Sequence, residues 1–303
     1  GNDRVQYTIP CQPYLFTTDA KGMGDYKTLQ GKSIRKIHFD SIRDARNYVQ
    51  DNEGVSGKHI YGMTNWIYPF INDHYEGTID YDAKLISVVS LDIETDSSGG
   101  FPNIETADKE VTGITVSKHG KYVVMGTKDF TPRQETFDNL ESPIKIEDIT
   151  YIKCANEFDL LNKFIDVWRS KQFLPDIVTG WNVEFFDMPY LINRITRILG
   201  PEAAKRMSPW GLLGSREVEI AGRSYNIPEV VGITILDYMQ LYKKFSFTMQ
   251  ESYKLDHIAN VVLGERKLDY DSLGFANLDE FYRGNFQKYI EYNIQDTRLV
   301  DKL

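Results

Sequence analysis

Residues that cross-link secreted proteins or bind transition metals are scarce in this chain. The 303 residues include only 2 cysteines, Cys11 and Cys154, which lie far apart in the sequence. This pair offers neither a disulfide framework nor the closely spaced cysteines of a zinc site. We therefore expect a reducing, intracellular environment.

Long apolar segments are absent as well. No uninterrupted run of about 18 apolar residues occurs, so we expect no membrane-spanning helix. The N-terminus has no basic segment followed by an apolar stretch, so we expect no secretory signal. With 41% hydrophobic and 26% charged residues, the composition is that of a globular protein with two domains or one large one.

Positive charge is in deficit. The chain has 35 lysines and arginines against 44 aspartates and glutamates, which gives a net charge of -9. Because contacts of Lys and Arg with phosphates supply most non-specific affinity for duplex DNA, we do not expect a protein that coats DNA. A nuclease remains compatible with this charge, because acidic clusters can bind metal ions and basic segments occur locally, at Lys243-Lys244 and from Arg194 to Arg206.

The sequence pattern changes near residue 86, where we place a domain boundary. Residues 1–86 predict a small α/β domain in which Asp40 or Ser41 caps a helix. The helical spacing that indicates a packed face is formed by Ile42, Ala45, Tyr48 and Val49. Residues 87–303 then form the larger domain.

The larger domain opens with a strongly apolar run. Leu85 to Leu91 is nearly continuous in apolar and β-branched residues, which predicts a strand buried on both faces of a mixed sheet. Asp92 and Glu94 follow directly, and because side chains alternate along a strand, both carboxylates should point to one face. Further strands at Val111 to Val116 and Tyr122 to Met125 would form a meander.

Helical and strand-like patterns alternate in the following segment. Asn156 is expected to cap a helix, and the apolar face of this helix consists of Leu161, Phe164, Ile165 and Trp168. Pro175 to Asn182 predicts a short buried strand, after which a helix begins with Pro189 in its first turn. Asp187 should therefore lie near a helix start.

The C-terminal part predicts a hairpin, a strand and a long helix. Residues 216–232 alternate around Ala221-Gly222-Arg223, which indicates a polar, protruding β-hairpin with a glycine turn. A strand is expected at Ile233 to Leu236. A helix from about Asn285 carries Tyr292 and Asp296 on one face.

The first of three acidic segments is Asp92-Ile93-Glu94. The pattern Asp-x-Glu is common, and it also occurs at Asp51/Glu53 and Asp108/Glu110. Only the pair at 92 and 94 ends a strongly apolar strand, where two like charges on one face repel each other unless a cation or a proton compensates them. This context favours metal binding.

The other two segments run from Asn182 through Phe186 to Asp187, and from Tyr292 to Asp296. Taken alone, Asn182 and Asp187 are more typical of helix caps, and Tyr292 with Asp296 could be an exposed polar pair. Among the 19 tyrosines, however, only Tyr292 has an aspartate four residues later. On a helix, this spacing brings a phenol and a carboxylate to one place.

Together the segments supply four carboxylates that could share two divalent cations: Asp92, Glu94, Asp187 and Asp296. Mg²⁺ and Mn²⁺ prefer such oxygen ligands. Two metal ions about 3.5 to 4 Å apart stabilise the attacking and leaving oxygens of an in-line displacement at phosphorus. The sequence therefore predicts two-metal cleavage of a phosphodiester.

In this order, the three segments resemble those of the DEDD superfamily of 3′–5′ exonucleases, and more closely the proofreading exonuclease of family B DNA polymerases. Tyr292 and Asp296 match the DEDDy branch, and no histidine stands near Asp296. The resemblance extends from about Pro13 to the end of the chain. Segments similar to T-even-type phage polymerases are Thr179 to Glu184, Leu236 to Phe245 and Tyr289 to Ile294.

The resemblance implies a role for each site residue. The metal ligands are Asp92, Glu94, Asp187 and Asp296. Tyr292 helps to position the attacking water, and Lys267 matches an active-site lysine that neutralises phosphate charge. Phe101 matches an aromatic residue that stacks on a base of the frayed primer end, and Asn182 and Phe186 also contact DNA. From the residues alone, Phe101 could instead anchor a turn, and Lys267 could be a solvated surface residue.

The resemblance also implies a fold and an activity. The fold is α/β, with an RNase H-like mixed-sheet exonuclease domain in residues 87–303 and a smaller, partial N-terminal polymerase domain in residues 1–86. The activity is a 3′–5′ exodeoxyribonuclease that uses two Mg²⁺ or Mn²⁺ ions to trim single-stranded or frayed DNA to 5′-mononucleotides. The palm, fingers and thumb are missing, so we expect no polymerase activity.

Partners and location follow from the same resemblance. The expected partners are single-stranded or primer-template DNA and the missing polymerase domain of the same chain. We expect the protein to be a monomer and not to associate with a membrane. The expected location is the cytoplasm, that of the host if a phage encodes the chain.

Two departures and two alternatives accompany this interpretation. The hairpin at 216–232 shares little with the family's strand-separating hairpin beyond a glycine and a basic residue, and Arg266 stands where the family has a glycine before Lys267. One alternative is a non-catalytic nucleic-acid-binding regulatory module, which would bind oligonucleotides with or without Mg²⁺. The other is an RNA-trimming DEDD nuclease, which would prefer RNA.

Overall fold

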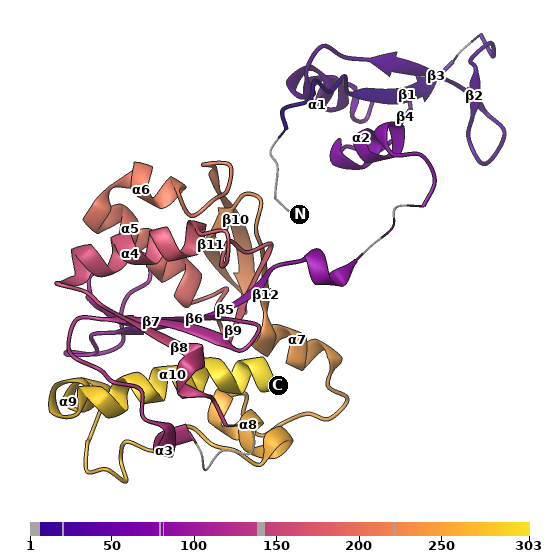
Figure 1. Cartoon of the computed structure of the whole chain (residues 1–303). Helices are drawn as coiled ribbons and strands as arrows, with labels where there is room; N and C mark the ends of the chain where they lie inside the picture. Colours follow the sequence, from indigo (N-terminus) through magenta and orange to yellow (C-terminus); the bar gives the residue numbers. More distant parts are fainter. Residues whose placement is uncertain (1–6, 20, 79, 81, 138–142, 221) are drawn as a thin grey trace. The chain divides into compact units, whose positions relative to one another are not determined.

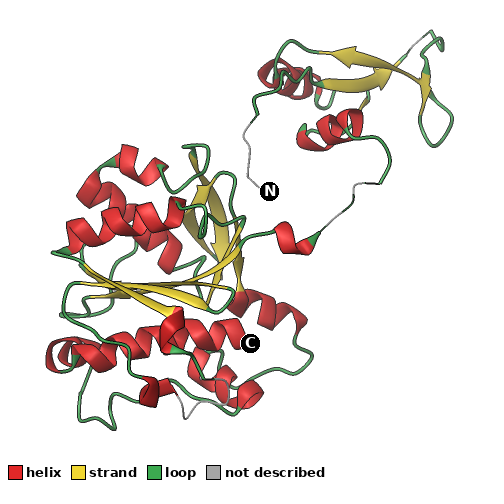
Figure 2. Ribbon diagram, viewed as in Figure 1, coloured by secondary structure: helices red, strands yellow, loops and turns green. Residues whose placement is uncertain are grey.

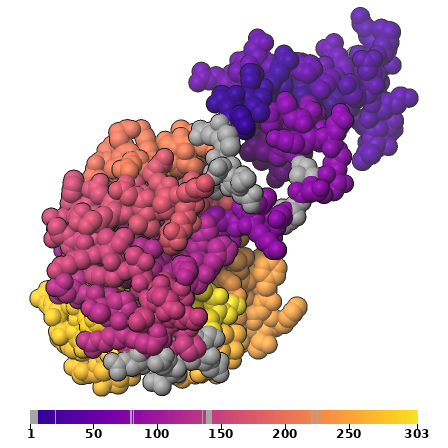
Figure 3. Space-filling model, in the orientation of Figure 1, coloured from indigo at the N-terminus to yellow at the C-terminus, as the bar shows by residue number. Residues whose placement is uncertain are grey.

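The chain forms two compact units, Gly1–Leu85 and Ile86–Leu303. The computed structural model describes residues 7–303 except 20, 79, 81, 138–142 and 221. Each unit has its own sheet (Figure 1) and its own hydrophobic core. In the space-filling view, atoms of the chain fill the spaces between the ribbons of the second unit (Figure 3). Among the described residues, no helix is long and apolar enough to cross a membrane.

The first unit is built on an antiparallel sheet with the strand order β2-β3-β1-β4. Its strands are β1 (Tyr14–Thr18), β2 (Tyr26–Lys27), β3 (Ser33–His38) and β4 (Ile60–Tyr61), and its helices are α1 (Ile42–Asn52) and α2 (Ile67–His74). Ser41 caps α1 by accepting the Asp44 N–H at 3.1 Å. Ala45 of α1 is fully buried with Leu15 and Trp66, whereas Ile42 at the helix start stays 39% exposed.

The second unit contains a mixed sheet with the strand order β12-β9-β5-β6-β7-β8 (Figure 2). Its strands are β5 (Val88–Thr95), β6 (Val111–Lys118), β7 (Lys121–Gly126), β8 (Ile149–Lys153), β9 (Ile177–Gly180) and β12 (Thr234–Asp237). β5, β6 and β7 form the predicted antiparallel meander, while β9 pairs in parallel with both β5 and β12. The predicted α/β fold with a mixed, RNase H-like sheet is confirmed.

Strand β5 begins later than predicted. Ala83–Leu85 forms the short 3-10 helix η1, and the pairing of β5 with β9 starts at Val88 opposite Ile177. Leu85, which was expected within the buried strand, is 56% exposed. The partner strand, and not the apolar run alone, determines where the strand starts.

Helices cover both faces of this sheet (Figures 1 and 2). α4 (Glu157–Arg169) and α5 (Asp187–Leu199) pack on one face, and α10 (Phe286–Lys302) packs on the other. Asn156 caps α4 as predicted, by accepting the Asp159 N–H at 3.0 Å. Asn285 caps α10 in the same way, by accepting the Lys288 N–H at 3.1 Å.

A hairpin and several short helices complete the second unit. The short helices are α3 (Gln134–Phe137), η2 (Ile146–Asp148), α6 (Pro201–Lys205), α7 (Tyr238–Phe245), α8 (Leu255–Leu263) and α9 (Leu278–Gly284). The hairpin predicted at 216–232 is formed by β10 (Leu213–Ile220) and β11 (Arg223–Val230). Gly222 in its turn has a φ of 74°, which favours glycine, whereas Ala221 lies outside the described residues.

Candidate metal centre

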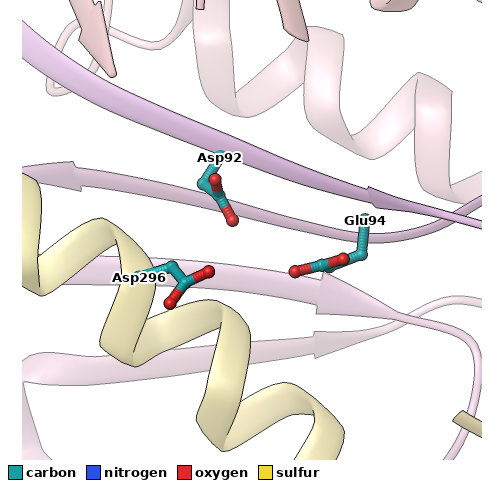
Figure 4. A group of neighbouring side chains, drawn as sticks. All are labelled: Asp92, Glu94 and Asp296. Atoms are coloured by element: carbon teal, nitrogen blue, oxygen red, sulfur yellow. The ribbon is translucent and has the colours of Figure 1, made fainter. Parts of the chain in front are cut away.

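Three of the predicted ligands come together between strand β5 and helix α10 (Figure 4). One oxygen from each of Asp92, Glu94 and Asp296 lies within 4.8 Å of the other two. Asp92 and Glu94 project from the same face of β5, as strand alternation predicted, and Asp296 reaches toward them from α10. Glu94 is 8% exposed and Asp296 is 3% exposed, whereas Asp92 is half-buried.

A glycine allows α10 to approach the sheet closely. A Cβ atom at Gly126 of β7 would lie 2.9 Å from Cζ of Phe286 and 3.3 Å from Cδ1 of Ile290, both on α10. Atoms in close-packed interiors do not tolerate such approaches without displacement. With glycine there, Ile290 and Ile294 pack fully against the sheet. This packing fixes the position of Asp296 further along the helix.

The acidic group carries negative charge in a place where burial opposes it. Burial and the neighbouring carboxylates of Asp187 and Glu94 raise the pKa of Asp92 well above its usual range. Burial and Asp296 raise the pKa of Glu94 to about 8. Oδ1 of Asp296 is buried and has no hydrogen-bond partner among the described residues. A divalent cation would both offset the repulsion and bind this oxygen.

Lys267 and Tyr292 lie beside Asp296. The Lys267 ammonium donates a hydrogen bond to the Tyr292 hydroxyl at 3.1 Å and another to the Asp296 carboxylate. Lys267 is therefore not the solvated surface residue that was one alternative, and its side chain is only 27% exposed. Tyr292 is 7% exposed, so the alternative of an exposed polar pair is wrong too. Burial raises the pKa of Tyr292 and keeps the phenol neutral.

The departure at Arg266 does not move Lys267 away from the site. Arg266 is directed to the Asp256 carboxylate at 3.2 Å, and its side chain is 66% exposed. The same carboxylate accepts the backbone N–H of Lys267 at 2.9 Å. Asp256 thus fixes the backbone at the point where the side chain of Lys267 turns toward the acidic group.

Asp187 lies next to the group of three. It begins helix α5, and its Oδ1 accepts the backbone N–H of Ile93, the residue between the two acids of β5, at 3.0 Å. Its side chain is 4% exposed, and burial raises its pKa to about 7. Asp187 is therefore attached to the strand that carries Asp92, and its role as a fourth ligand stays a prediction.

The predicted DNA-binding residues surround the start of α5. Asn182 has a φ of 66°, and the carboxylate of Asp237 accepts its backbone N–H at 3.2 Å. The ring of Phe186 lies 5.3 Å from that of Phe101 and 5.6 Å from that of Tyr190. Phe101 is 82% exposed, so most of its ring is open to a stacking partner. Contacts of these residues with DNA stay predictions.

Sequence reasoning missed two residues that support the site. Asp237 ends strand β12, and besides Asn182 its carboxylate accepts the N–H of Glu184 at 3.1 Å, so it shapes the loop before Asp187. Asn293 on α10 is fully buried and donates a hydrogen bond to Oδ2 of Asp92 at 2.5 Å. Its position three residues before Asp296, a predicted ligand on the same helical face, is a signal that could have identified it.

Comparison with known proteins gives one family and a consistent set of relatives. The family described as DNA polymerase family B, exonuclease domain, matches residues 62–258. The chain is 35% identical to a DNA-directed DNA polymerase of Escherichia phage RB69, over 99% of this chain and 34% of the relative. It is 33% identical to the DNA-directed DNA polymerase of Enterobacteria phage T4, over 100% of this chain and 34% of the relative.

A more distant relative comes from an animal virus. The DNA polymerase catalytic subunit of Psittacid herpesvirus 1 is 30% identical over 73% of this chain and 20% of the relative. The chain thus spans about a third of the length of the phage polymerases that it matches, at 34% in both cases.

Proposed function

This chain belongs to the exonuclease-domain family of the family B DNA polymerases, and we propose that it is a metal-dependent 3′–5′ exonuclease that acts on DNA. It removes nucleotides from single-stranded or frayed 3′ ends and releases 5′-mononucleotides. The observation that carries this proposal is the largely buried group of Asp92, Glu94 and Asp296, because the single ammonium of Lys267 does not balance three adjacent carboxylates.

The donor set fits divalent metal ions. All of the acidic groups offer oxygen, which Mg²⁺ and Mn²⁺ prefer, and Oδ1 of Asp296 has no other partner in the described part of the chain. Asp92, Glu94 and Asp296 would hold one ion, and Asp92 with Asp187 a second. When bound, such ions supply positive charge at the attacking and leaving oxygens of phosphodiester hydrolysis.

Tyr292 and Lys267 act on the scissile phosphate and the attacking water. The Tyr292 hydroxyl accepts the hydrogen bond from Lys267 and lies beside the Asp296 carboxylate, where it can orient a water molecule bound at the acidic group. The Lys267 ammonium neutralises negative charge that develops on the phosphate. Because the pKa of Tyr292 is raised by burial, the phenol orients the water as a neutral group.

Aromatic stacking holds the end of the DNA strand. The exposed ring of Phe101, supported by Phe186, offers a face to a terminal base, and Asn182 contacts the last nucleotide. Only unpaired nucleotides can enter such a site. Mismatched ends are preferred because fraying them costs less free energy than opening paired ends.

The partners of this site follow from the relatives. The matched phage proteins are named DNA polymerases, and this chain spans 34% of their length. We therefore propose that single-stranded or primer-template DNA is the substrate and that the remaining polymerase polypeptide is the partner. We also propose that the protein works as a monomer in the cytoplasm of the infected host.

Cleavage of a mismatch-ended DNA tests the function directly. A 3′-recessed DNA labelled at the 5′ end of the recessed strand is incubated with the chain, with Mg²⁺ or with chelator, and resolved on a gel over time. The expected result is a ladder that shortens one nucleotide at a time with Mg²⁺ only. An intact but shifted band under both conditions would indicate the binding module, and faster shortening of a matched RNA would indicate the RNA-trimming nuclease.

The acidic pair provides the first variant. Asp92→Ala with Glu94→Ala should suppress cleavage by several orders of magnitude without unfolding the chain, because the ligands of the ion are lost. The matched control is Asp51→Ala with Glu53→Ala, which removes the same sequence pattern from exposed positions of the first unit. Near-normal cleavage by the 92/94 variant would contradict the assignment of Asp92 and Glu94 as metal ligands.

A further inference from the structure

Asn293 and Thr115 connect helix α10 to two strands at the site. Asn293 is 0% exposed, and its Nδ2 donates to Oδ2 of Asp92 at 2.5 Å. Its Oδ1 accepts a hydrogen bond from the hydroxyl of Thr115, which is 0% exposed as well. Thr115 lies on β6 directly opposite Asp92 in the register of β5 and β6. The three side chains therefore form a continuous chain of hydrogen bonds that leads from the buried Thr115 and Asn293 to the half-buried Asp92.

The carboxylate of Asp92, which only accepts when ionised, determines which way the Asn293 amide points. An amide has one accepting end and one donating end. The NH₂ group is therefore directed at the carboxylate of Asp92, and the hydroxyl of Thr115, which can donate or accept, donates to Oδ1 at the other end. The reversed amide would place two acceptors, Oδ1 of Asn293 and Oδ2 of Asp92, against each other, which is unfavourable.

Asn293 fixes Asp92 without adding charge. Lys267 binds Asp296 as an ammonium, and its positive charge offsets part of the negative charge at that residue. The neutral amide of Asn293 adds no positive charge that would compete with a metal ion for Asp92. The Asn293 amide binds one oxygen of the Asp92 carboxylate, Oδ2, and this hydrogen bond limits rotation of the carboxylate about the Cβ–Cγ bond.

We propose that Asn293 and Thr115 are positioning residues that hold the Asp92 carboxylate in the orientation in which it binds a divalent cation. This inference rests on the proposed function, because the orientation matters only if the site binds metal. Side chains that orient metal ligands contribute about 10- to 100-fold to metal affinity or activity. The effect of these two residues should therefore be measurable without DNA.

Four variants separate positioning from packing. Asn293→Ala removes the amide, Thr115→Val removes only the hydroxyl at nearly constant shape, and Thr115→Ser restores it. Thr297→Val is the matched control, since Thr297 is 1% exposed on the same helix and donates to the backbone carbonyl of Asn293 at 3.1 Å. The readouts are Mn²⁺ affinity without DNA, measured by electron paramagnetic resonance of free Mn²⁺, and kcat and KM for DNA cleavage.

We expect Asn293→Ala to weaken Mn²⁺ binding by about 10- to 100-fold and Thr115→Val to weaken it in the same direction by less. Thr115→Ser and Thr297→Val should bind like the wild type. At limiting Mn²⁺, the kcat of a variant should fall in proportion to its loss of Mn²⁺ affinity. The KM for DNA should stay unchanged, because the predicted DNA contacts are intact. A merely structural role would lower the melting temperature and leave Mn²⁺ affinity unchanged.

Wild-type Mn²⁺ affinity in both Asn293→Ala and Thr115→Val overturns the proposal. If Asn293→Ala does not fold, Thr115→Val against Thr115→Ser decides it alone. Failure of the proposed function is seen separately, in the wild type. A wild-type chain that binds Mn²⁺ but leaves DNA intact contradicts the exonuclease and still permits the affinity comparison, whereas a wild-type chain that binds no Mn²⁺ overturns both.

Discussion

At the residue scale, like charges are held together in a buried place. Asp92, Glu94 and Asp296 are close enough to share one cation, and burial raises the pKa of Glu94 to about 8. Without a cation, each additional charge destabilises the folded chain relative to the unfolded one. Sites of this kind reduce the stability of the empty protein and gain affinity for their ligand.

Glu94→Gln should therefore stabilise the metal-free chain. Glutamine has nearly the same shape as glutamate but no charge, so repulsion with Asp92 and Asp296 is reduced. In chelator and mildly alkaline buffer, we expect the Tm to rise by about 2 to 4 °C, which corresponds to about 1 kcal/mol. Mg²⁺ should raise the Tm of the wild type more than that of the variant. Differential scanning calorimetry measures both.

The control for this prediction is Glu53→Gln, which removes an exposed carboxylate from the first unit. Its Tm should match that of the wild type, since exposed surface substitutions rarely have large effects. A lower Tm for Glu94→Gln in chelator would show that hydrogen bonds of the carboxylate outweigh repulsion, contrary to the charge argument.

The positions of the acidic residues in the fold were easier to predict than those of the residues that surround them. Asp92 and Glu94 follow from strand alternation, and Asp296 follows from its spacing to Tyr292 on a helix. Both patterns involve residues that are close together in the chain, so they can be recognised in a single sequence. Lys267 reaches Asp296 only because the segment after α8 lies against α10, a contact between distant parts of the chain. Such contacts depend on tertiary packing that local periodicity does not encode.

At the element scale, the position of α10 determines whether the site forms. Near the end of this helix, Arg298 and Lys302 both bind Glu265, in the segment after α8, with distances to its Oε1 of 3.2 Å and 2.7 Å. Arg298 is 2% exposed. Hydrogen bonds from Arg298 and Lys302 hold the pKa of Glu265 at about 2, below its usual 4.5. This ion-pair group attaches α10 to the segment that carries Lys267.

Glu265→Gln should destabilise the chain in a pH-dependent manner. At neutral pH, removal of the charge that Arg298 and Lys302 share should lower the free energy of unfolding by on the order of 3 kcal/mol. A carboxylate whose pKa is lowered by folding stabilises only while it is ionised. The difference from the wild type should therefore be complete above pH 4.5 and shrink as the pH falls toward about 2. Urea unfolding at a series of pH values measures it.

Glu202→Gln is the matched control for the buried ion pair. Glu202 pairs with Lys205 on α6, but their side chains are 81% and 48% exposed. Exposed pairs contribute about 0 to 1 kcal/mol, so this variant should unfold nearly as the wild type does at every pH. An effect of Glu265→Gln that persists unchanged in acid would contradict the assignment to ion pairing.

Whole elements were predictable where a cap and a periodic face coincide. Asn156 and the apolar face after it gave α4 correctly, and Asn285 gave the start of α10. Strand boundaries were less accurate. β5 begins at Val88, and β10 begins at Leu213, where it pairs with Val230. In both cases a partner strand sets the boundary, and the sequence of one strand does not specify its partner.

At the scale of the whole molecule, the predicted site residues lie in one of two units. All four predicted ligands lie in Ile86–Leu303, together with Lys267, Tyr292 and Asn293. The first unit, Gly1–Leu85, has a separate core that includes Leu15 and Trp66. The family match, at residues 62–258, extends across the boundary between the units. Membership in the family therefore does not by itself say which unit the activity needs.

Residues 86–303 alone should fold, bind Mn²⁺ and shorten DNA as the whole chain does, because their core and their acidic group are formed entirely within this unit. Calorimetry and Mn²⁺ titration of the truncated chain measure the first two properties, and the gel assay measures the third.

Residues 1–85 are the matched control. They contain the same Asp-x-Glu pattern at Asp51 and Glu53, but on an exposed helix end. They should neither bind Mn²⁺ comparably nor shorten DNA. If residues 86–303 fold and bind Mn²⁺ but no longer shorten DNA, the first unit takes part in holding the substrate, and the confinement of the activity to the second unit is wrong.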